Sequence, residues 1–315
     1  MLNNIGIVVI GRNQGERLRA CLASVTGNAL CVYVDSGSSD GSAAMAREMG
    51  IDVVALDHRS PFTAARARNE GFDRLTQLLP AAEFVQFIDG DCQLVDGWLE
   101  DACRALRDEE RVAAICGRRR EQFPDRSIYN GLMDLEWNRP AGLVASVGGD
   151  AMFRVSAFRD VGGFNPQIVA GEEPELCVRL RDAGWHLRRI GREMTLHDAN
   201  MLTFAQWWRR QVRSGFGASD VFARTDGRVF GTMLQSVQFW TATWIWICVL
   251  AALIGPMALI IAILLVPAQM LHIAARANRG RPSNSMRIAH GFFTMLGKWA
   301  MLMGRMRYLR NAEKH

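Results

Sequence analysis

The 315-residue chain lacks the cysteine patterns that form disulfide frameworks and zinc sites. Its seven cysteines are scattered, none belongs to a Cys-X-X-Cys pair, and their number is odd. These features favour a reducing, cytosolic environment over secretion. The first residues also lack a basic segment and a small-residue cleavage site. We therefore expect residues 5–10 to form a first strand and not part of a signal peptide.

Internal repeats and low-complexity segments are absent as well. Hydrophobic residues make up 49% of the chain and charged residues 22%, which excludes an intrinsically disordered protein. The length allows one large domain with an appendage, or two domains. No glycine-rich, lysine-bearing phosphate loop lies near the N-terminus, which argues against a nucleotidyltransferase.

Charged residues are missing from the stretch at 237–273. A helix that spans a bilayer needs about 20 apolar residues. The stretch can therefore hold two short spans with a bend at Gly255-Pro256, or one span and an interfacial segment. A pair of core helices in a soluble protein is the alternative. Trp240, Trp244 and Trp246 near its start are typical of the aromatic belt at a membrane interface.

The C-terminal segment is strongly basic. Glu313 is its one acidic residue, against nine basic residues: Arg276, Arg279, Arg281, Arg287, Lys298, Arg305, Arg307, Arg310 and Lys314. Because this segment follows a membrane-like stretch, it favours membrane lipids at the cytosolic face over nucleic acid. We predict amphipathic interface helices at 201–235, a transmembrane or re-entrant hairpin at 236–275 and a basic amphipathic tail at 276–315.

The first 116 residues alternate between strand-like and helix-like segments. Stretches of helical periodicity separate five strand-like apolar runs, at residues 5–10, 31–34, 53–56, 84–88 and 112–116. This order predicts an α/β fold with a mostly parallel, Rossmann-like sheet and helices on both faces. Such sheets bind ligands at the carboxyl ends of their strands, where Asp35, Asp89 and Asp91 occur. Residues 117–147 are irregular.

The run at 84–88 ends in two aspartates, Asp89 and Asp91, with Gly90 between them. Two like charges at a strand end need something that offsets their repulsion. A divalent cation bound to diphosphate oxygens does this, because hard cations take carboxylate and phosphate oxygens as ligands. A solvated turn is the alternative, since Asp-Gly pairs are common in turns.

Three further segments carry candidate chemistry. Asp35 can accept hydrogen bonds from a base or ribose, or it can belong to a capped turn. Arg68 suits phosphate oxygens, or it lies on a solvated helix face. Glu172, Glu173 and Glu175 surround Pro174, which suggests a general base near the start of a helix. Favourable acidic charge at a helix N-terminus is the alternative for this cluster.

Taken in order, these segments resemble the family-2 inverting glycosyltransferases, which have the GT-A nucleotide-diphospho-sugar transferase fold. The similarity is carried by residues 7–10 with Asn13, 34–42, 67–71, 87–91, 148–154, 162–165 and the Glu172/Glu173 cluster. The resemblance implies a GT-A domain at 1–200, with a nucleotide-sugar half at 1–116 and an acceptor half at 117–200.

The resemblance also implies roles for individual residues. The donor would be bound by Asn13, Asp35, Ser36, Arg68, Asp89, Gly90, Asp91, Gly149 and Asp150. Asp91, with Asp89 and His197, would hold Mg²⁺ or Mn²⁺, although a lone histidine is more often structural. Glu173 stands where the family usually has an aspartate as catalytic base. The family's Gly-Glu-Asp-X-Glu-Leu is Gly-Glu-Glu-Pro-Glu-Leu here, which leaves open whether Glu172 or Glu173 is the base.

Such an enzyme would transfer a sugar from a nucleotide diphosphate, most commonly a UDP-sugar in this family. Processive members carry a Gln-X-X-Arg-Trp signature, which the segment around Gln211 does not match. We therefore expect a single transfer to a lipid-linked (polyprenyl) saccharide at the cytoplasmic face of the bacterial inner membrane, in polysaccharide assembly. Direct transfer to polyprenyl phosphate and a non-catalytic membrane scaffold with the same fold are the alternatives.

Overall fold

The computed structural model describes residues 4–27, 29–277, 280 and 282–312. The chain divides into two compact units. The first comprises Met1–Gln122 and Arg139–Ala199, and the second comprises Phe123–Asn138 and Asn200–His315. The predicted acceptor half at 117–200 is thus divided between them. Four charged residues of the predicted tail lie outside the described residues: Arg279, Arg281, Glu313 and Lys314.

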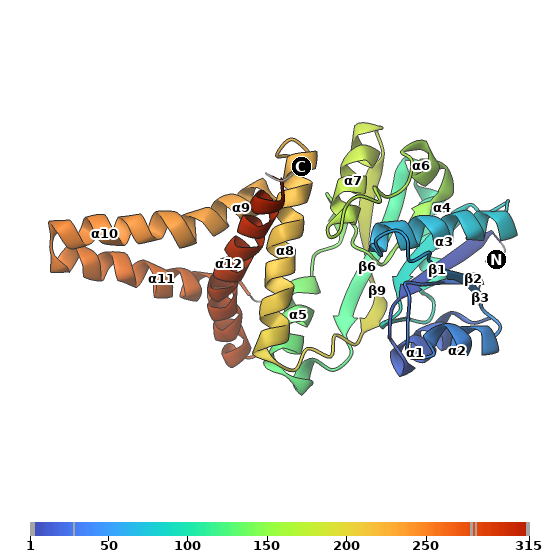
Figure 1. Cartoon of the computed structure of the whole chain (residues 1–315), viewed down its shortest axis with the longest axis horizontal. Coiled ribbons are helices and arrows are strands. Elements are labelled where there is room, and N and C mark those ends of the chain that lie inside the picture. The colour runs from blue at the N-terminus through green and yellow to red at the C-terminus, as the bar shows by residue number, and fades with distance from the viewer. Residues whose placement is uncertain (1–3, 28, 278–279, 281, 313–315) are drawn as a thin grey trace. The chain divides into compact units, whose positions relative to one another are not determined.

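One half of the sheet in the first unit consists of parallel strands. They lie in the order β3-β2-β1-β4. Their bounds are β1 (Ile5–Gly11), β2 (Leu30–Asp35), β3 (Asp52–Ala55) and β4 (Phe84–Asp89). The connecting helices are α1 (Glu16–Val25), α2 (Ser42–Glu48) and α3 (Ala64–Leu78). Helices α1 and α2 lie on one face of this half and α3 on the other (Figure 1).

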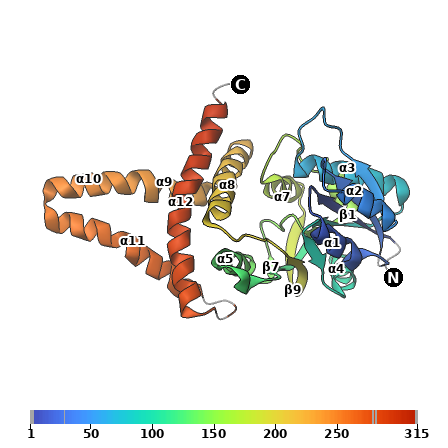
Figure 2. The same cartoon turned by 60° about the horizontal axis from the view of Figure 1, so that its bottom comes forward.

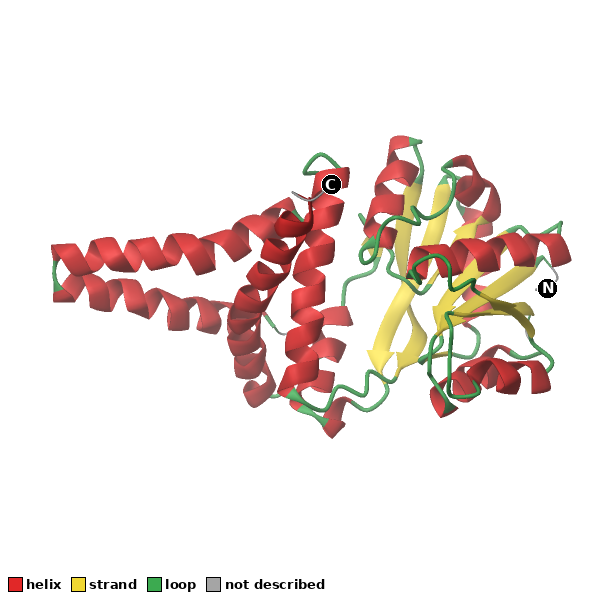
Figure 3. Ribbon diagram, in the orientation of Figure 1, coloured by secondary structure: helices red, strands yellow, loops and turns green. Residues whose placement is uncertain are grey.

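The other half of the sheet is mixed. It contains β5 (Cys92–Leu94), β6 (Val112–Glu121), β7 (Gly142–Leu143), β8 (Ala151–Arg154) and β9 (His186–His197). Strand β8 pairs antiparallel with β4 and β6, β6 and β9 are parallel, and β5 and β7 pair antiparallel with β9. The remaining helices of this unit are α4 (Trp98–Asp108), α6 (Val155–Asp160) and α7 (Glu172–Asp182). Figure 3 shows this mixed, mostly parallel sheet between its helices, as the sequence predicts.

Several elements of this half differ from the sequence prediction, including the short strands β5 and β7 and the longer strands β6 and β9. Strand β6 continues to Glu121, beyond the apolar run that ends at Cys116, and β9 was not predicted. Arginines and a glutamate interrupt the apolar positions of β9, and its register against β6 shifts three times. A strand with such irregular pairing does not show the simple alternation that identifies a half-buried strand.

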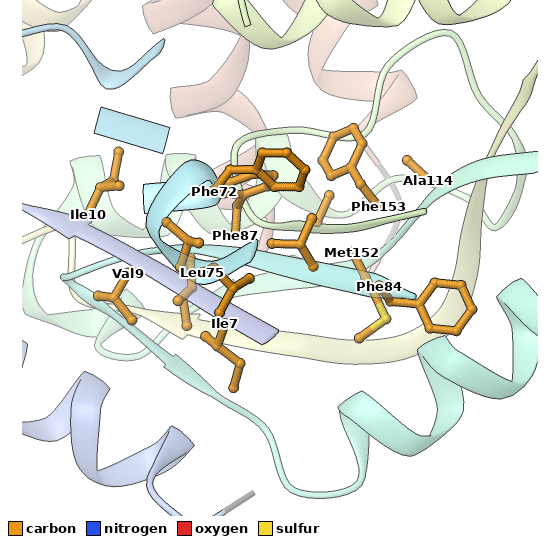
Figure 4. Close-up of a cluster of buried hydrophobic side chains, with 14 of the residues drawn as sticks. Ile7, Val9, Ile10, Phe72, Leu75, Phe84, Phe87, Ala114, Met152 and Phe153 are labelled. Carbon is orange, nitrogen blue, oxygen red and sulfur yellow. The ribbon is translucent and has the colours of Figure 1, made fainter. Parts of the chain in front are cut away.

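The core of the first unit lies around the central strands. Phe87 contacts Phe153, Phe158 and Phe164, with ring centroids 5.4 to 5.7 Å apart. Figure 4 shows Phe87 and Phe153 of this cluster beside aliphatic side chains of β1 and Leu75 of α3. Because the central strands are buried on both faces, they are apolar at nearly every position.

Helix α3 lies directly on β1 and β2. Added to Gly71, a methyl group would collide with Val8 and Val34, so the glycine permits this close approach. Thr63 caps the helix by accepting a hydrogen bond from the backbone N–H of Arg66. This packing places Arg68, near the start of α3, at the carboxyl edge of the strands.

The second unit is helical throughout its described residues. Its elements are η1 (Pro124–Arg126), α5 (Ile128–Trp137), α8 (Phe204–Arg224), α9 (Gly231–Gln238), the π-helix η2 (Phe239–Thr243), α10 (Trp244–Ile254), α11 (Pro256–Arg276) and α12 (Asn284–Ala312). Helix α5 falls in the segment that the sequence left irregular. Helices α8 and α12 touch through glycines: a methyl group at Gly215 would overlap the backbone of Met301, and one at Gly304 would overlap that of Val212.

Two helices of this unit are long and apolar enough to cross a membrane. They are Gly231–Ile254, of 24 residues, and Pro256–Arg276, of 21 residues, and they meet at Gly255, whose φ is 150°. Figures 1 and 2 show α10 and α11 side by side as a hairpin. Within the apolar windows only 17% and 11% of the residues are buried. Core helices of a soluble protein would be mostly buried.

Candidate functional site

Asp89 and Asp91 lie at the carboxyl edge of the parallel strands. Asp89 ends β4 in register with Ile10 of β1, and the N–H of Gly90 donates to the carbonyl of Ile10 at 2.8 Å. The chain then enters β5 directly after Asp91. Asp35 ends β2, in register with Gly11. The three aspartates therefore lie at the ends of the two strands that flank β1, as the sequence predicts for a ligand-binding edge.

Arg68 connects two acidic groups at this edge. Its Nη2 lies 2.7 Å from Oδ1 of Asp89, and its Nη1 lies 2.5 Å from Oε1 of Glu172, at the start of α7. The Arg68 side chain is only 3% exposed, so both ion pairs are shielded from water. Next to them, a methyl group at Gly149 would crowd the Arg68 guanidinium. Arg68, Asp89, Glu172 and Gly149 thus form one connected group.

Asp150 fixes the position of Asp89 through a direct hydrogen bond and through Arg119. Its Oδ1 accepts the backbone N–H of Asp89 at 3.0 Å, and its Oδ2 accepts the Thr195 hydroxyl at 3.0 Å. Arg119 of β6 places Nη2 2.5 Å from the same Oδ2 and 3.2 Å from Oδ2 of Asp89. The Asp150 side chain is completely buried. Its oxygens are thus directed to groups of the protein that fix the position of Asp89.

Arg119 and Thr195 were not among the predicted site residues. The signal for Arg119 was the run Arg118-Arg119-Arg120, one residue after the apolar run that ends at Cys116 and therefore close to the carboxyl end of a strand, where ligands bind. Thr195 lies in the unpredicted strand β9 and had no local signal.

The charges shift the pKa of Asp89. Burial raises it, Arg68 and Arg119 oppose this, and the neighbouring Asp150 and Asp91 add to it. The net pKa is above the usual value for an aspartate. Arg68 and Arg119 therefore offset part of the negative charge of the carboxylates at this site.

Asp91 lies beside His197, the last residue of β9. Asp91 Oδ2 is 3.6 Å from His197 Nε2, and the other ring nitrogen is 3.5 Å from Oε2 of Glu121. Burial works against both charges, yet the interaction with His197 holds the pKa of Asp91 at about 2. Burial also lowers the pKa of His197, but Asp91 and Glu121 outweigh it and raise that pKa.

This pair belongs to a possible cation site. Ligand atoms of Asp91, Cys92 and His197 all lie within 4.8 Å of one another. Burial raises the pKa of the Cys92 thiol well above its usual range, so the sulfur stays protonated and is a poor ligand for a hard cation. A carboxylate and an imidazole remain, and these donors fit Mn²⁺ or Mg²⁺ when phosphate oxygens complete the shell.

Glu172 and Glu173 have different surroundings. Glu172 is paired with Arg68, whereas Glu173 is buried and accepts hydrogen bonds from the N–H of Val147 at 2.6 Å and from the Cys177 thiol at 2.8 Å. Burial raises the pKa of Glu173, and the bonds from Cys177 and Val147 oppose this only in part. The two adjacent carboxylates thus differ in environment, because Glu172 has a cationic partner and Glu173 has only neutral hydrogen-bond donors. Such a difference is typical of sites in which two carboxylates have different chemical roles.

Asp35, Asn13 and Ser36 form a second group at the ends of β1 and β2. Asp35 accepts hydrogen bonds from the N–H groups of Gly37 and Ser38 at 3.1 and 2.8 Å and from the Tyr33 hydroxyl at 2.9 Å. Asn13 accepts from the N–H of Ser39 at 2.8 Å, and Ser36 donates its N–H to the carbonyl of Gly11 at 3.0 Å. These bonds shape the two loops that follow β1 and β2.

The family of this region follows from comparison with known sequences. Residues 6–162 match the family described as Glycosyl transferase family 2. This stretch is a glycosyltransferase family 2 domain. It contains Asn13, Asp35, Arg68, Asp89, Asp91 and Asp150, while Glu172, Glu173 and His197 follow it in the chain.

Two curated relatives from strains of Mycobacterium tuberculosis bear the name "Pre-mycofactocin glycosyltransferase". Each is 27% identical over 232 residues, which cover 70% of this chain and 48% of the relative. The chain therefore spans about half the length of the curated relatives it matches.

Solved structures show the same fold. A mannosyltransferase from Pyrobaculum calidifontis, solved in complex with GDP-Man and Mn²⁺, has a TM-score of 0.60 at 17% identity and covers 97% of this chain and 87% of its own. Residues 1–349 of S. aureus TarS give a TM-score of 0.52 at 12% identity, with 93% and 92% covered. The predicted GT-A fold is thereby confirmed.

Proposed function

We propose that this chain is an inverting, non-processive glycosyltransferase. It moves one sugar from a nucleotide diphosphate donor, a UDP-sugar, to a lipid-linked polyprenyl saccharide at the cytoplasmic face of the inner membrane. The observation that carries this proposal is the arrangement at the carboxyl edge of the sheet. There Asp91 lies beside His197, while Arg68 joins Asp89 to the helix that bears Glu172 and Glu173.

The donor diphosphate needs positive charge around it. Asp91 and His197 supply oxygen and nitrogen donors for Mg²⁺ or Mn²⁺, and the mannosyltransferase neighbour was solved with GDP-Man and Mn²⁺. When bound, such a cation stabilises the negative charge that develops on the leaving diphosphate. Arg68 and Arg119 provide two further fixed charges at the same edge. Asp35 and Asn13 hold the loops against which the nucleoside would lie.

We assign the general base to Glu173 and a positioning role to Glu172. A base works best when its pKa lies near the working pH, and the pKa of Glu173 is raised. Glu172 instead neutralises and orients Arg68. Glu173 takes the proton of the acceptor hydroxyl as the oxygen attacks the anomeric carbon, and the sugar–phosphate bond breaks on the opposite side. This single displacement inverts the configuration.

The helical hairpin supports membrane association. The sequence between Arg228 and Arg276 contains no Asp, Glu, Lys or Arg, and the residues that bound it are basic. Basic residues favour the cytoplasmic side of a membrane. Both ends of the hairpin would then lie on the cytoplasmic side, where a lipid-linked acceptor presents its headgroup. The name of the mycobacterial relatives makes pre-mycofactocin the second acceptor to test.

The test is donor binding and hydrolysis by the full chain in detergent, with UDP-, GDP- and dTDP-sugars and with Mn²⁺ or Mg²⁺. We expect one donor to bind with metal, and Asp91→Ala to abolish binding. Asp96→Ala is the matched control, because Asp96 is exposed just beyond β5. Transfer to a polyprenyl-diphosphate saccharide is then measured with the donor found. A folded protein that binds none of these donors would contradict the proposed enzyme and favour the scaffold.

A further inference from the structure

The second unit contains an apolar cavity of about 190 Å³. It lies among η2, α10, α11 and α12. Three tryptophans, Trp240, Trp244 and Trp299, line it together with aliphatic, methionine and phenylalanine side chains. The cavity is separate from the carboxylate site, since every residue that lines it belongs to the hairpin or to α12.

The cavity wall is held in place by the helices themselves. Trp244 donates its indole N–H to the carbonyl of Ala262 on α11, at 3.2 Å. Its polar group is thereby satisfied, and the flat faces of the ring remain for apolar contacts. Trp299 and Phe292 of α12 are 38% and 45% exposed. The cavity is therefore a preformed apolar hollow with an open side.

A cation lies at the margin of this hollow. Lys298 precedes Trp299 and donates from Nζ to the hydroxyl of Ser236 at 2.7 Å. Ser236 is four residues before Trp240 in a continuous helical stretch, so the two side chains share a helix face. Burial lowers the pKa of Lys298. Across the described residues it has no acidic partner, so a phosphate would provide the missing counter-charge.

We propose that this cavity binds part of the prenyl chain of the lipid-linked acceptor and that Lys298 pairs with its phosphate. The proposal rests on the proposed function, because it names the site for that acceptor's lipid. Size supports it: an apolar cavity of about 150 Å³ can hold a benzene molecule, and a five-carbon isoprene unit is of similar size. The rest of the chain would lie along the exposed apolar side chains of the hairpin, such as Leu250 and Leu264.

Binding of undecaprenyl phosphate to the full chain in nanodiscs tests this site, followed by native mass spectrometry and by quenching of tryptophan fluorescence. We expect Lys298→Met to weaken binding about tenfold, because a hydrogen-bonded charge pair is lost, and Lys298→Arg to restore it. Undecaprenol, which lacks the phosphate, should bind equally to wild type and Lys298→Met. Leu296→Trp, which fills the cavity, should weaken both ligands.

Further measurements distinguish a prenyl chain from other molecules that could occupy the cavity. Met303→Trp adds the same ring to an exposed position of α12 outside the cavity, and it should bind like the wild type. Equal affinity for dioleoyl phosphatidate and undecaprenyl phosphate would overturn the proposal in favour of a general phospholipid groove. Binding that is unchanged in both Lys298→Met and Leu296→Trp would overturn it as well.

Donor binding by the wild-type protein is measured in the same preparation. A protein that binds a nucleotide sugar but no prenyl phosphate overturns the cavity assignment alone. A protein that binds prenyl phosphate through Lys298 but no nucleotide sugar supports the cavity and overturns the proposed function.

Discussion

His197 ends β9 with its Nε2 atom 3.6 Å from a carboxylate oxygen of Asp91, which follows β4. Strand β5 makes this possible, because Cys92 pairs directly with His197 in the antiparallel register of β5 and β9. The second ring nitrogen of His197 faces the buried Glu121. A carboxylate behind an imidazole fixes its orientation and makes it a stronger ligand.

We therefore predict that His197→Gln weakens Mn²⁺ binding by about tenfold or more in the presence of UDP. The expected loss is smaller for Mg²⁺, which prefers oxygen ligands. Electron paramagnetic resonance of free Mn²⁺ measures the first affinity, and competition by Mg²⁺ measures the second. His186→Gln is the control, since His186 is exposed at the start of the same strand. Unchanged Mn²⁺ affinity in His197→Gln would show that the histidine is only structural.

Asp150→Asn should destabilise the first unit by about 3 kcal/mol, because it leaves the Arg119 charge without its buried partner. Hydrogen exchange in peptides from β4 and β8 reports on this unit alone. The same change at Asp160, which is exposed at the end of α6, should alter stability by less than about 0.5 kcal/mol. Equal protection in the two variants would show that Asp150 does not brace β4.

Local sequence patterns are sufficient to predict half of this site. Asp89 and Asp91 follow a strand-like run in which Gln86 is the one polar residue, and the order of strands and helices brings them to the same edge as Asp35. Arg68 could be predicted because it lies in the helix that leads to that strand.

The rest of the site depends on contacts that no local pattern contains. The family resemblance implied Asp150, but Arg119 of β6 and Thr195 of β9 meet it only when three strands pair in a mixed order. Strand β9 is half polar because it lies beside the site, so it lacks strand periodicity. Helix α5 was missed in a segment with prolines on both sides, where capping by Ser127 sets its start.

Cys177→Ala should move the acid limb of the pH–rate profile to higher pH. The thiol donates a hydrogen bond to Glu173 and lowers its pKa, so its loss raises that pKa further. Only the ionised carboxylate can accept the proton of the acceptor. Sugar transfer measured from pH 4 to 9 gives the profile, and Cys103→Ala, another buried helical cysteine, should leave it unchanged.

The raised pKa of Glu173 also makes stability depend on pH, in the opposite direction to activity. Because folding raises the pKa of Glu173 above 4.5, its contribution to stability is fully present below that pH and is lost as the pH rises through the folded pKa.

For the activity test, an acid limb that moves to lower pH in Cys177→Ala would contradict the assignment of Glu173 as the base.

The crossing of α8 and α12 gives a test of packing in the second unit. Gly304→Ala should lower the free energy of unfolding by about 1 to 3 kcal/mol, since its methyl group has no room against the backbone of Val212. Gly297→Ala lies on the same helix, where the methyl group would make ordinary contacts at 3.5 Å with Trp207. This variant should stabilise the helix slightly, because alanine has the higher helix propensity. Thermal unfolding in detergent compares the pair, and equal midpoints would refute the close crossing.

The tip of the hairpin distinguishes a re-entrant hairpin from one that crosses the bilayer. Leu253 and Ile254 are 80% and 81% exposed in the structure, and no charged residue lies near the bend at Gly255. A tip that reached water on the far side would gain from polar residues, so we predict that it stays in the hydrocarbon. There, Leu253→Glu should cost about 2 to 3 kcal/mol and release part of the protein from liposomes in flotation. Leu143→Glu, at a comparably exposed leucine in β7, is the control and should leave flotation unchanged. If Leu253→Glu floats like the wild type, and a cysteine at that position reacts with an impermeant maleimide added from the far side, the hairpin crosses the membrane.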